Sequence, residues 1–419
     1  MRPILLGFGL VPLCIMMIVL YIVTIAVGED ADTLISAAPG GYRVLAPDSM
    51  ISFPFELFQG DICFRGKINN RDVRLLLDDG FMWDPLLLWG SPRVDSLDLT
   101  YDGEVDIGGS DDVHAIASRT ASRITLSFPG VEFHDQTAVV TPYSSGVSNM
   151  WSGSEGQVSC TFFKHFVVDI NFDKMRITLI EPKKFIYRGH GAEIPWKPLG
   201  FGPWSIPATL DLADGRQVTL ELMMDLGYND QLQIAGNGEH RIPTPSRRIP
   251  ESLGFNIQGR ETRGFAGRIE QVTIGGYEIK DVLAGFIIPE HSDHAFHEVM
   301  IGLGLLSRFN LVFDYSRQRL FVEPNHTFAE PFEYDMSGVT LGPGDSTCLE
   351  VKALIPDSPA DDAGLRAGDK ITAINGRPAA TYTLWERMPL MRREGKTVTL
   401  SVQREGRTRE VTLTLRRLL

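Results

Sequence analysis

The stretch VRLLLDDGFMWD, residues 73–84, decides how the rest of the chain is interpreted. Three leucines lead directly into Asp78 and Asp79, and Gly80 follows. An apolar run of this kind is typical of a buried strand. A carboxylate that a strand delivers into a buried turn is costly unless another group pairs with it. The stretch therefore raises the question of what pairs with Asp78 and what the acid does.

The same pattern occurs a second time in the chain. LLLDDG at residues 75–80 and LMMDLG at residues 222–227 are both an apolar triplet, then Asp, any residue and Gly. A segment that is typical of two strands and a turn precedes each copy. The first turn is predicted at Asn69–Asn70 and the second at Asp214–Gly215, and such residue pairs are strong hairpin signals.

The two copies match again further along the chain. FVVDINFDKMRITLI, from Phe166, aligns without gaps on FNLVFDYSRQRLFVE, from Phe309. The aspartates of the two copies are 147 residues apart (225 − 78) and these phenylalanines 143 (309 − 166), a difference that a change in loop length explains. Residues 45–185 and 190–327 are therefore predicted to be two lobes of one duplicated β unit.

The composition and the C-terminal sequence complete the predicted fold class. Forty-one glycines and 25 prolines favour many short strands and turns, so the chain is predicted to be mainly β. From about Phe332 strand-like runs surround a short helical stretch, Ala360–Ala363, that ends at Gly364. Residues 332–419 are expected to form a separate small α+β domain.

The N-terminus is predicted to anchor the chain in a membrane. Residues 3–28 carry no charge, and about 20 apolar residues span a bilayer as a helix. Arg2 precedes the run and acidic residues follow it, which keeps the N-terminus in the cytoplasm. We expect a signal-anchor helix at 1–28, a linker at 29–44 and an extracytoplasmic body, periplasmic if the source is bacterial. Cleavage behind Gly28 and secretion is the alternative.

Other chemistry is poorly supported. A net charge of -13 argues against a general nucleic-acid binder, which needs a basic face. Three histidines, His291, His294 and His297, stand three residues apart, and a zinc or copper site there is conceivable. Their spacing matches no tight ligand motif, so a solvated loop is preferred and neither a metal nor a cofactor is predicted.

The duplicated Asp-x-Gly unit resembles the aspartic peptidase fold, of retropepsin or pepsin type. Residues 299–324, VMIGLGLLSRFNLVFDYSRQRLFVEP, resemble the second signature of that family, in which an apolar-apolar-Gly strand lies behind the active turn. Ile301 and Gly302 fill those positions. GSEGQVSCTFFKHF in the first lobe, with Gly156, is a weaker version. The resemblance implies two barrel-like lobes in one chain.

The resemblance also implies a catalytic pair. Asp78 and Asp225 would lie about 3 Å apart and share one proton, because two charges that close cannot both ionise. Gly80 and Gly227 would permit the tight turns that present them. Asp-x-Gly is also a common turn and occurs at Asp106 and Asp362 without the apolar triplet.

The chain departs from the family at the middle residue of each turn, where Thr or Ser bonds across to the other lobe. Asp79 accepts such a bond but donates only when protonated, and the Leu226 side chain does neither. Phe81 and Tyr228 stand where a small or hydroxylic residue is usual. Two hypotheses therefore stay open: an active endopeptidase, or an inactive peptide clamp and scaffold. A flap is expected at 106–109, although this could equally be a surface turn.

Residues 357–376, DSPADDAGLRAGDKITAING, are similar to PDZ domains of bacterial envelope proteases. This implies a module that binds an extended peptide by adding it as a strand, with backbone amides holding the terminal carboxylate. The residues that most resemble the carboxylate loop are Ser337, Gly338, Val339, Thr340 and Leu341. The alternative is a PDZ domain that packs on the lobes and never binds a free C-terminus. Protein or peptide substrate is the other expected partner.

Overall fold

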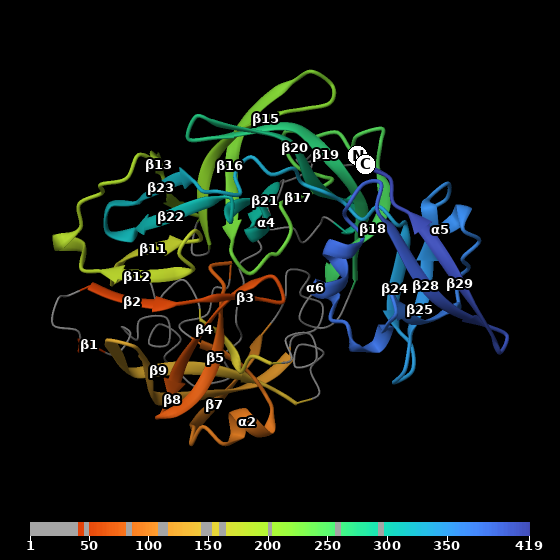
Figure 1. Ribbon diagram of the computed structural model, residues 1–419. Helices are drawn as coiled ribbons and strands as arrows, with labels where there is room; N and C mark the ends of the chain where they lie inside the picture. Colours follow the sequence, from red (N-terminus) through yellow and green to blue (C-terminus); the bar gives the residue numbers. More distant parts are fainter. Residues whose placement is uncertain are drawn as a thin grey trace, which may run out of the picture.

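The structure is a computed structural model that describes residues 41–45, 50–80, 86–107, 116–143, 153–158, 165–199, 203–255, 261–291 and 297–419. The described chain is mainly β, as predicted (Figure 1). No helix within these ranges is long and apolar enough to cross a bilayer. The predicted anchor at 1–28, and most of the linker at 29–44, lie outside them.

The first lobe is built from strands around the first Asp-x-Gly turn. They are β1 (Tyr42–Val44), β3 (Glu56–Phe58), β4 (Asp61–Ile68), β5 (Arg71–Leu77), β6 (Leu86–Trp89), β7 (Thr100–Ile107), β8 (Ile116–Phe128), β9 (Val131–Thr141) and β10 (Gly156–Val158), with the short helix α2 (Pro92–Asp95). The turn between β4 and β5 is at Asn69–Asn70, as predicted, and both asparagines are left-handed, with φ of 48° and 66°. A ring of six strands, β9-β6-β10-β5-β4-β8, closes through the β8–β9 pair into a barrel.

The second lobe has the same plan. Its strands are β14 (Lys197–Pro198), β15 (Trp204–Asp211), β16 (Gln217–Asp225), β17 (Leu232–Ile234), β18 (Ile249–Phe255), β19 (Glu261–Ile274), β20 (Tyr277–Ile287) and β21 (Val299–Gly302), followed by α4 (Leu303–Leu306). The ring β20-β17-β21-β16-β15-β19 closes through the β15–β19 pair. The parallel pairs correspond as well, because β5–β10 and β6–β9 match β16–β21 and β17–β20. The strand pairings thus repeat, as the sequence repeat predicts.

A sheet shared by the two lobes joins them. It runs β13-β23-β22-β11-β12-β2 and contains β2 (Met50–Pro54), β11 (Val167–Asn171), β12 (Arg176–Ile180), β13 (Ala192–Pro195), β22 (Phe309–Asp314) and β23 (Arg319–Pro324). Strands β11 and β22 meet antiparallel, with Asp169 opposite Val312. These two residues correspond to each other in the ungapped alignment, so a pseudo-twofold axis passes between them. The two lobes are therefore related by this axis.

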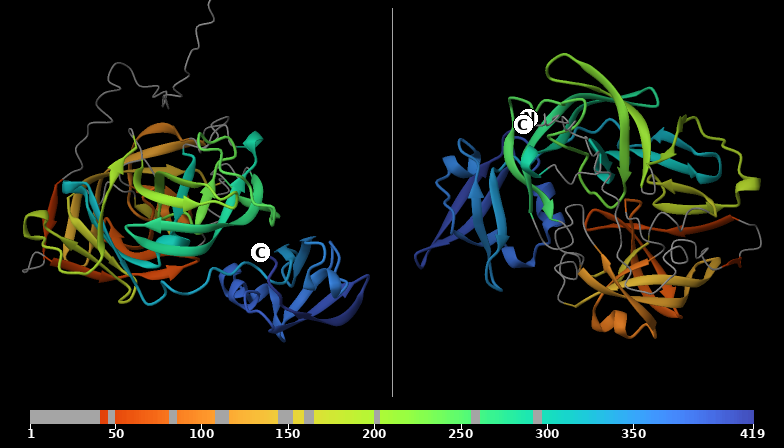
Figure 2. Two further views of the ribbon diagram at one scale, coloured as in Figure 1. Left: turned by 90° about the horizontal axis from the view of Figure 1, so that it is seen from above. Right: turned by 180° about the vertical axis from the view of Figure 1, so that it is seen from behind.

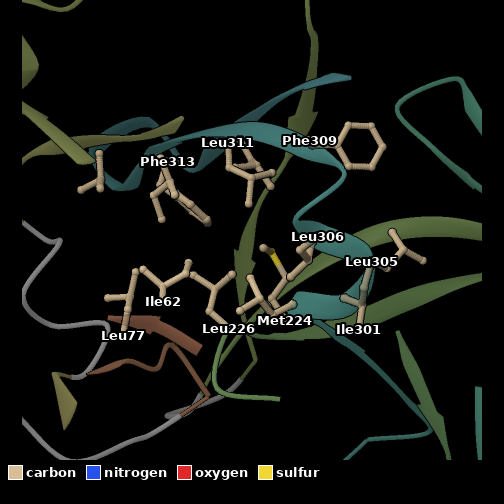
Figure 3. Close-up of a cluster of buried hydrophobic side chains, with 14 of the residues drawn as sticks. Ile62, Leu77, Met224, Leu226, Ile301, Leu305, Leu306, Phe309, Leu311 and Phe313 are labelled. Atoms are coloured by element: carbon tan, nitrogen blue, oxygen red, sulfur yellow. The ribbon is translucent and has the colours of Figure 1, made fainter. Parts of the chain in front are cut away.

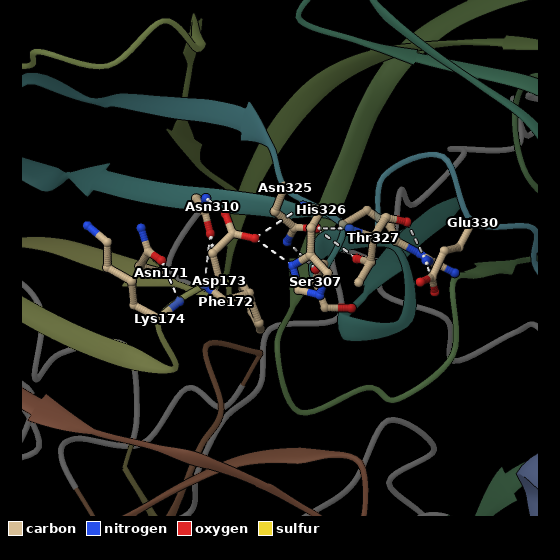
Figure 4. A network of polar contacts seen from close by, with 11 residues as sticks. Asn171, Phe172, Asp173, Lys174, Ser307, Asn310, Asn325, His326, Thr327 and Glu330 are labelled. Atoms are coloured by element: carbon tan, nitrogen blue, oxygen red, sulfur yellow. Dashed lines mark hydrogen bonds and ion pairs between the residues drawn. The ribbon is translucent and has the colours of Figure 1, made fainter.

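Polar contacts between the lobes fix their orientation near this sheet (Figure 4). Asn310 accepts a 2.8 Å hydrogen bond from the backbone N–H of Phe172 and donates one of 2.7 Å to the Asp173 carboxylate. The His326 ring also lies 2.5 Å from Asp173. The lobes are thus held by side chains as well as by the shared strands.

One apolar core runs through both lobes. Figure 3 shows Leu77 and Ile62 from the first lobe beside Met224 and Leu226 from the second, with the α4 leucines to one side and the β22 aromatics above. Leu226 is fully buried in this cluster. The strands that end at the two Asp-x-Gly turns therefore emerge from a common hydrophobic base.

The C-terminal domain lies beside the lobe pair in every view (Figure 2). Its elements are β24 (Val339–Pro343), β25 (Leu349–Leu354), α5 (Pro359–Asp362), β26 (Lys370–Ile374), β27 (Arg377–Pro378), α6 (Leu384–Arg387), β28 (Thr397–Arg404) and β29 (Arg407–Thr414). Single-turn 3-10 helices occur in this domain at Ala379–Thr381 and Met388–Leu390, and in the lobe pair at Pro182–Lys184, Pro289–His291 and Tyr315–Arg317. The domain has its own buried apolar cluster, which includes Val351, Ile371 and Leu400.

The C-terminal domain also touches both lobes. A Cβ on Gly60, in the β3–β4 turn, would lie 2.4 Å from the Trp385 ring of α6, so this ring covers the turn. On the second lobe, Arg247 donates to the backbone carbonyl of Leu418 at 3.2 Å. Leu419 is buried within the core cluster of the lobes. These contacts connect the domain to the body at several points.

Candidate active site

The structure brings the two Asp-x-Gly turns together. Asp78 follows the last residue of β5, and Asp225 is the last residue of β16. A Cβ on Gly80 would lie 2.4 Å from Cγ of Asp225, and a Cβ on Gly227 would lie 2.5 Å from Cγ of Asp78. Contacts under 3.0 Å essentially never occur for real Cβ atoms. Each glycine is therefore needed because the carboxyl group of the opposite lobe occupies the space of a side chain.

Each aspartate is held by its own turn in the same way. The N–H of Gly80 donates to Oδ1 of Asp78 at 2.9 Å, and the N–H of Gly227 donates to Oδ1 of Asp225 at 2.8 Å. The two carboxyl groups also form a side-chain hydrogen bond with each other. Two carboxyl oxygens form such a bond only when a proton lies between them.

The surroundings of Asp225 favour its protonated form. Burial, followed by the charges of Asp78 and Asp79, raises the pKa of Asp225 well above its usual value. The hydrogen bond from the Gly227 N–H acts against this rise, but it is a smaller effect. Asp225 therefore keeps a proton at a pH at which an ordinary aspartate has lost it.

Asp79 accepts a cross-lobe hydrogen bond, as its chemistry allows, although the Leu226 side chain cannot donate one. Its Oδ1 accepts a 2.5 Å hydrogen bond from the backbone N–H of Leu226, in the opposite turn. Burial, partly offset by this bond, raises the pKa of Asp79 to about 7. Sequence reasoning considered only what the Leu226 side chain offers, whereas the donor is its backbone. One cross-lobe bond is therefore present.

Leu226 has a different use. Its side chain is fully buried in the shared core and lies near Leu77 and Met224 (Figure 3). It anchors the second turn from below and offers no hydrogen bond to the first. The two middle residues thus hold the site by different means.

Ile301 and Gly302 lie behind the second turn, where the sequence places them. Strand β21 runs parallel to β16, with Gly302 opposite Asp225. A Cβ on Gly302 would lie 2.4 Å from the Tyr228 carbonyl oxygen, so only glycine fits beside the turn. Ile301 is fully buried beneath it. Tyr228 itself is half-buried, and burial raises the pKa of its hydroxyl well above the usual value.

In the first lobe the register corrects the role of Gly156. Strand β10 places Gly156 opposite Leu75 and Val158 opposite Leu77, so Val158 corresponds to Ile301. Gly156 lies two positions earlier, where a Cβ would come within 2.2 Å of the Leu87 carbonyl oxygen. It allows β10 to fit between β5 and β6 and does not correspond to Gly302.

Gln157, which sequence reasoning missed, contacts the site directly. Its Nε2 donates to Oδ2 of Asp78 at 2.7 Å. The residue is only 6% exposed, so the contact is made in the interior. The signal in the sequence was a polar residue between Gly156 and Val158, in a segment predicted to lie behind the turn.

Other predicted features are described only in part. Asp106 and Ile107 end β7, while Gly108 and Gly109 lie outside the described residues, as does Phe81. His291 and His297 are described and His294 is not. Within the described ranges no three His, Cys, Asp or Glu side chains are grouped so that they could hold a metal ion.

The predicted carboxylate loop of the C-terminal domain is occupied from within. Oδ1 of Asp335 accepts hydrogen bonds from the backbone N–H groups of Ser337, at 2.8 Å, and Gly338, at 2.9 Å. The N–H of Val339 donates to Oγ of Ser337 at 3.2 Å. Thr340 is exposed and Leu341 half-buried on β24, which pairs only with β25 among the described strands.

Comparisons with known proteins agree with part of this description. A profile of the PDZ domain matches residues 338–415, which therefore form a PDZ domain. The solved structure of an aspartic proteinase from Irpex lacteus is similar to 67% of this chain and to 99% of its own chain, at 12% sequence identity and a TM-score of 0.45. No curated protein sequence matches the chain. The strand pairings and contacts above, and not this distant similarity, support the proposals below.

Proposed function

We propose that this protein is an aspartic endopeptidase that hydrolyses peptide bonds with Asp78 and Asp225. The observation that carries the proposal is the reciprocal contact of the two turns, in which each glycine makes room for the opposite carboxyl group. Asp78 and Asp225 are both half-buried, which supports access of a water molecule, and the raised pKa of Asp225 supports a shared proton. The remaining site residues, Asp79, Gly80, Leu226, Gly227, Ile301 and Gly302, support the turns.

In the proposed reaction the two acids have different roles. The Asp78 carboxylate takes a proton from a water molecule, whose oxygen attacks the scissile carbonyl carbon. Protonated Asp225 donates its proton to the carbonyl oxygen at the same time, which gives a tetrahedral gem-diol and leaves Asp225 ionised. One hydroxyl of the gem-diol then returns a proton to Asp225. As the C–N bond breaks, the proton on Asp78 passes to the leaving nitrogen, and the original protonation state returns.

Cleavage of an unfolded protein tests this proposal. The full chain is incubated with a denatured, disulfide-free protein between pH 3 and pH 8, with and without a peptide that carries a hydroxyl at the scissile position. We expect new peptide termini in mass spectra, and we expect the hydroxyl peptide to suppress them. Intact substrate at every pH would overturn the proposal.

The alternative is a peptide clamp that binds without hydrolysis. Leu226 favours it, because its buried side chain makes no hydrogen bond to the first turn. Catalytic groups must be held to within about 0.5 Å, and a single cross-lobe bond fixes them less firmly than two. Binding of the unfolded protein without any cleavage would support this alternative.

We also propose that the PDZ domain recruits protein substrate, as PDZ domains bind peptides by strand addition. The edge of β24 that is unpaired among the described strands supports peptide binding by strand addition. The Asp335 side chain limits it, because it already occupies the N–H groups of the carboxylate loop. A C-terminal carboxylate has to displace the Asp335 side chain from the N–H groups of Ser337 and Gly338. Asp335→Ala should therefore tighten binding of a C-terminal peptide in a titration, and Asp357→Ala, outside the loop, is the control. Equal binding by both variants would mean that the loop is not used.

We keep the membrane-anchored, extracytoplasmic location as a proposal that rests on the uncharged run of residues 3–28. Fractionation of cells that express the full chain tests it. Recovery with the membrane fraction is expected, and release into the medium would indicate secretion after cleavage instead.

A further inference from the structure

The strand behind Asp78 is fixed on both sides. Strand β10 pairs with β5 and with β6, and Gly156 fits where a Cβ would meet the Leu87 carbonyl oxygen at 2.2 Å. The carbonyl oxygen of Val158 accepts a 3.2 Å hydrogen bond from the N–H of Asp78. Gln157 stands between these two anchored residues. Its backbone position relative to Asp78 is therefore set by the sheet.

The Gln157 side chain uses this position to reach the carboxylate. Its amide nitrogen donates to Oδ2 of Asp78 at 2.7 Å, while the Gly80 N–H donates to Oδ1 at 2.9 Å. Both oxygens of Asp78 thus accept a hydrogen bond from this lobe. A donated hydrogen bond stabilises a carboxylate relative to its protonated form.

The duplicated chain contains its own comparison. Gln157 lies opposite Leu76 on β5, and in the second lobe Met300 lies opposite Met223 on β16. Leu76 and Met223 each precede their catalytic aspartate by two residues, so Gln157 and Met300 are equivalent. The side chain of methionine has no N–H or O–H to donate. The second lobe therefore has no counterpart of this hydrogen bond at the equivalent position.

Other titratable groups lie on the elements around Asp78. Asp79 follows it in the chain, Asp225 and Tyr228 belong to the opposite turn, and Asp61 begins β4, which pairs with β5. When ionised, each of these groups opposes a charge on Asp78. A donor at Oδ2 therefore favours Asp78 as the ionised member of the pair.

We propose that Gln157 is a positioning residue that assigns the base role to Asp78 and leaves the shared proton on Asp225. The inference rests on the proposed function. It adds a reason why Asp78 is the base and Asp225 the proton donor, although the backbone presents the two acids in the same way. Met300 contributes to the same asymmetry because it gives Asp225 no equivalent donor.

Gln157→Met tests the proposal, because it places in the first lobe the residue of the second. The pH dependence of kcat/KM is measured with a cleaved peptide, and Gln271→Met on β19 is the control. We expect the acid limb of the profile to move up by about one pH unit, with a roughly tenfold loss below it and little loss above it. An equal loss at every pH would indicate a merely structural role and overturn the proposal.

A reciprocal variant sharpens the test. Met300→Gln, added to Gln157→Met, should move the donor to Asp225 and bring the acid limb back down. An unchanged limb in the double variant would contradict the proposal. Binding of the hydroxyl peptide, followed by calorimetry across pH, gives a readout without turnover. If the wild type does not cleave but the pH dependence of its binding still shifts with Gln157→Met, the proposed hydrolysis fails while the effect of Gln157 on the charge of Asp78 stands.

Discussion

The two Asp-x-Gly turns make the same backbone hydrogen bond to their aspartate but hold the site with different side chains. In the first lobe the middle residue, Asp79, reaches across and accepts a hydrogen bond from the Leu226 N–H. In the second lobe the middle residue, Leu226, points into the core. Behind the turns, Gln157 donates to Asp78, whereas Met300 has nothing to donate. The two copies thus keep the same turn, while these two side-chain hydrogen bonds are made by residues of the first lobe only.

The largest expected effect tests whether both lobes contribute an acid. Asp78→Asn and Asp225→Asn keep the shape of each side chain but remove the proton exchange, so cleavage should fall by roughly 10²–10⁴-fold or more in each. Rates are measured on one peptide, and Asp362→Asn, in another Asp-x-Gly segment, is the control. A wild-type rate in either Asp78→Asn or Asp225→Asn would show that this acid is not needed for cleavage.

The next effect concerns the symmetric glycines. Gly80→Ala and Gly227→Ala each place a Cβ within 2.5 Å of the opposite carboxyl carbon and must displace it. A misplacement of about 1 Å costs about 100-fold in rate, so similar losses are expected in both variants. Gly41→Ala, which has nothing within 4 Å, is the control. A loss in only one variant would show that the turns are not equivalent.

Asp79→Asn sharpens the difference between the middle residues. The amide oxygen still accepts the Leu226 N–H but no longer ionises. Since the folded pKa of about 7 lies above the ordinary 3.8, the stability that Asp79 contributes is present below about pH 4 and lost as pH rises to 7. The variant should therefore gain stability over the wild type across this interval, on the order of a few kcal/mol. Thermal unfolding at several pH values measures this difference in stability between the variant and the wild type.

A stability difference of constant size between pH 4 and pH 8 would contradict the raised pKa of Asp79. Leu226→Asn serves as the matched variant, because it places a polar group in the shared core and should lose stability at every pH.

The smallest effect on activity lies far from the turns. Asp314 corresponds to Asn171 in the first lobe, and it is fully buried with Arg317 and Arg319 on Oδ2 at 2.7 Å and 3.0 Å. Asp314→Asn should cost about 1–3 kcal/mol with little change in kcat/KM. Burial acts to raise the pKa of Asp314, but hydrogen bonds from Ser316 and the two arginines outweigh it and lower the pKa. The contribution of Asp314 to stability is therefore present above about pH 4 and lost as pH falls below it. A stability difference that grows on acidification would contradict this.

The repeat could be predicted from the sequence, and most of the fold could be predicted from the repeat. The apolar triplets before Asp78 and Asp225, and the ungapped match of Phe166 with Phe309, predict equivalent strands because hydrophobic pattern and turn residues are local properties. The PDZ domain was predicted from the resemblance of residues 357–376 to a known family, and it is confirmed by the match at residues 338–415. The lobe boundaries at 185 and 190 stay predictions.

Several features of the site could not be predicted, because they depend on contacts between distant segments. The bond from Gln157 to Asp78 joins residues 79 positions apart. The register that separates Gly156 from Gly302, and the backbone donor of Leu226, follow from sheet pairing and not from a local pattern. The capture of the PDZ loop by Asp335 depends on the route by which the chain enters the domain.

The most direct measurement compares two ligands on the full chain. One is a substrate peptide, and the other is the same peptide with a tetrahedral hydroxyl at the scissile position, both titrated by calorimetry at the pH of best binding. A site with one proton between Asp78 and Asp225 should bind the hydroxyl peptide at least about 100-fold more tightly, and Asp225→Asn should abolish that preference. Equal affinity for both peptides would mean that the two acids do not form a hydrolytic pair.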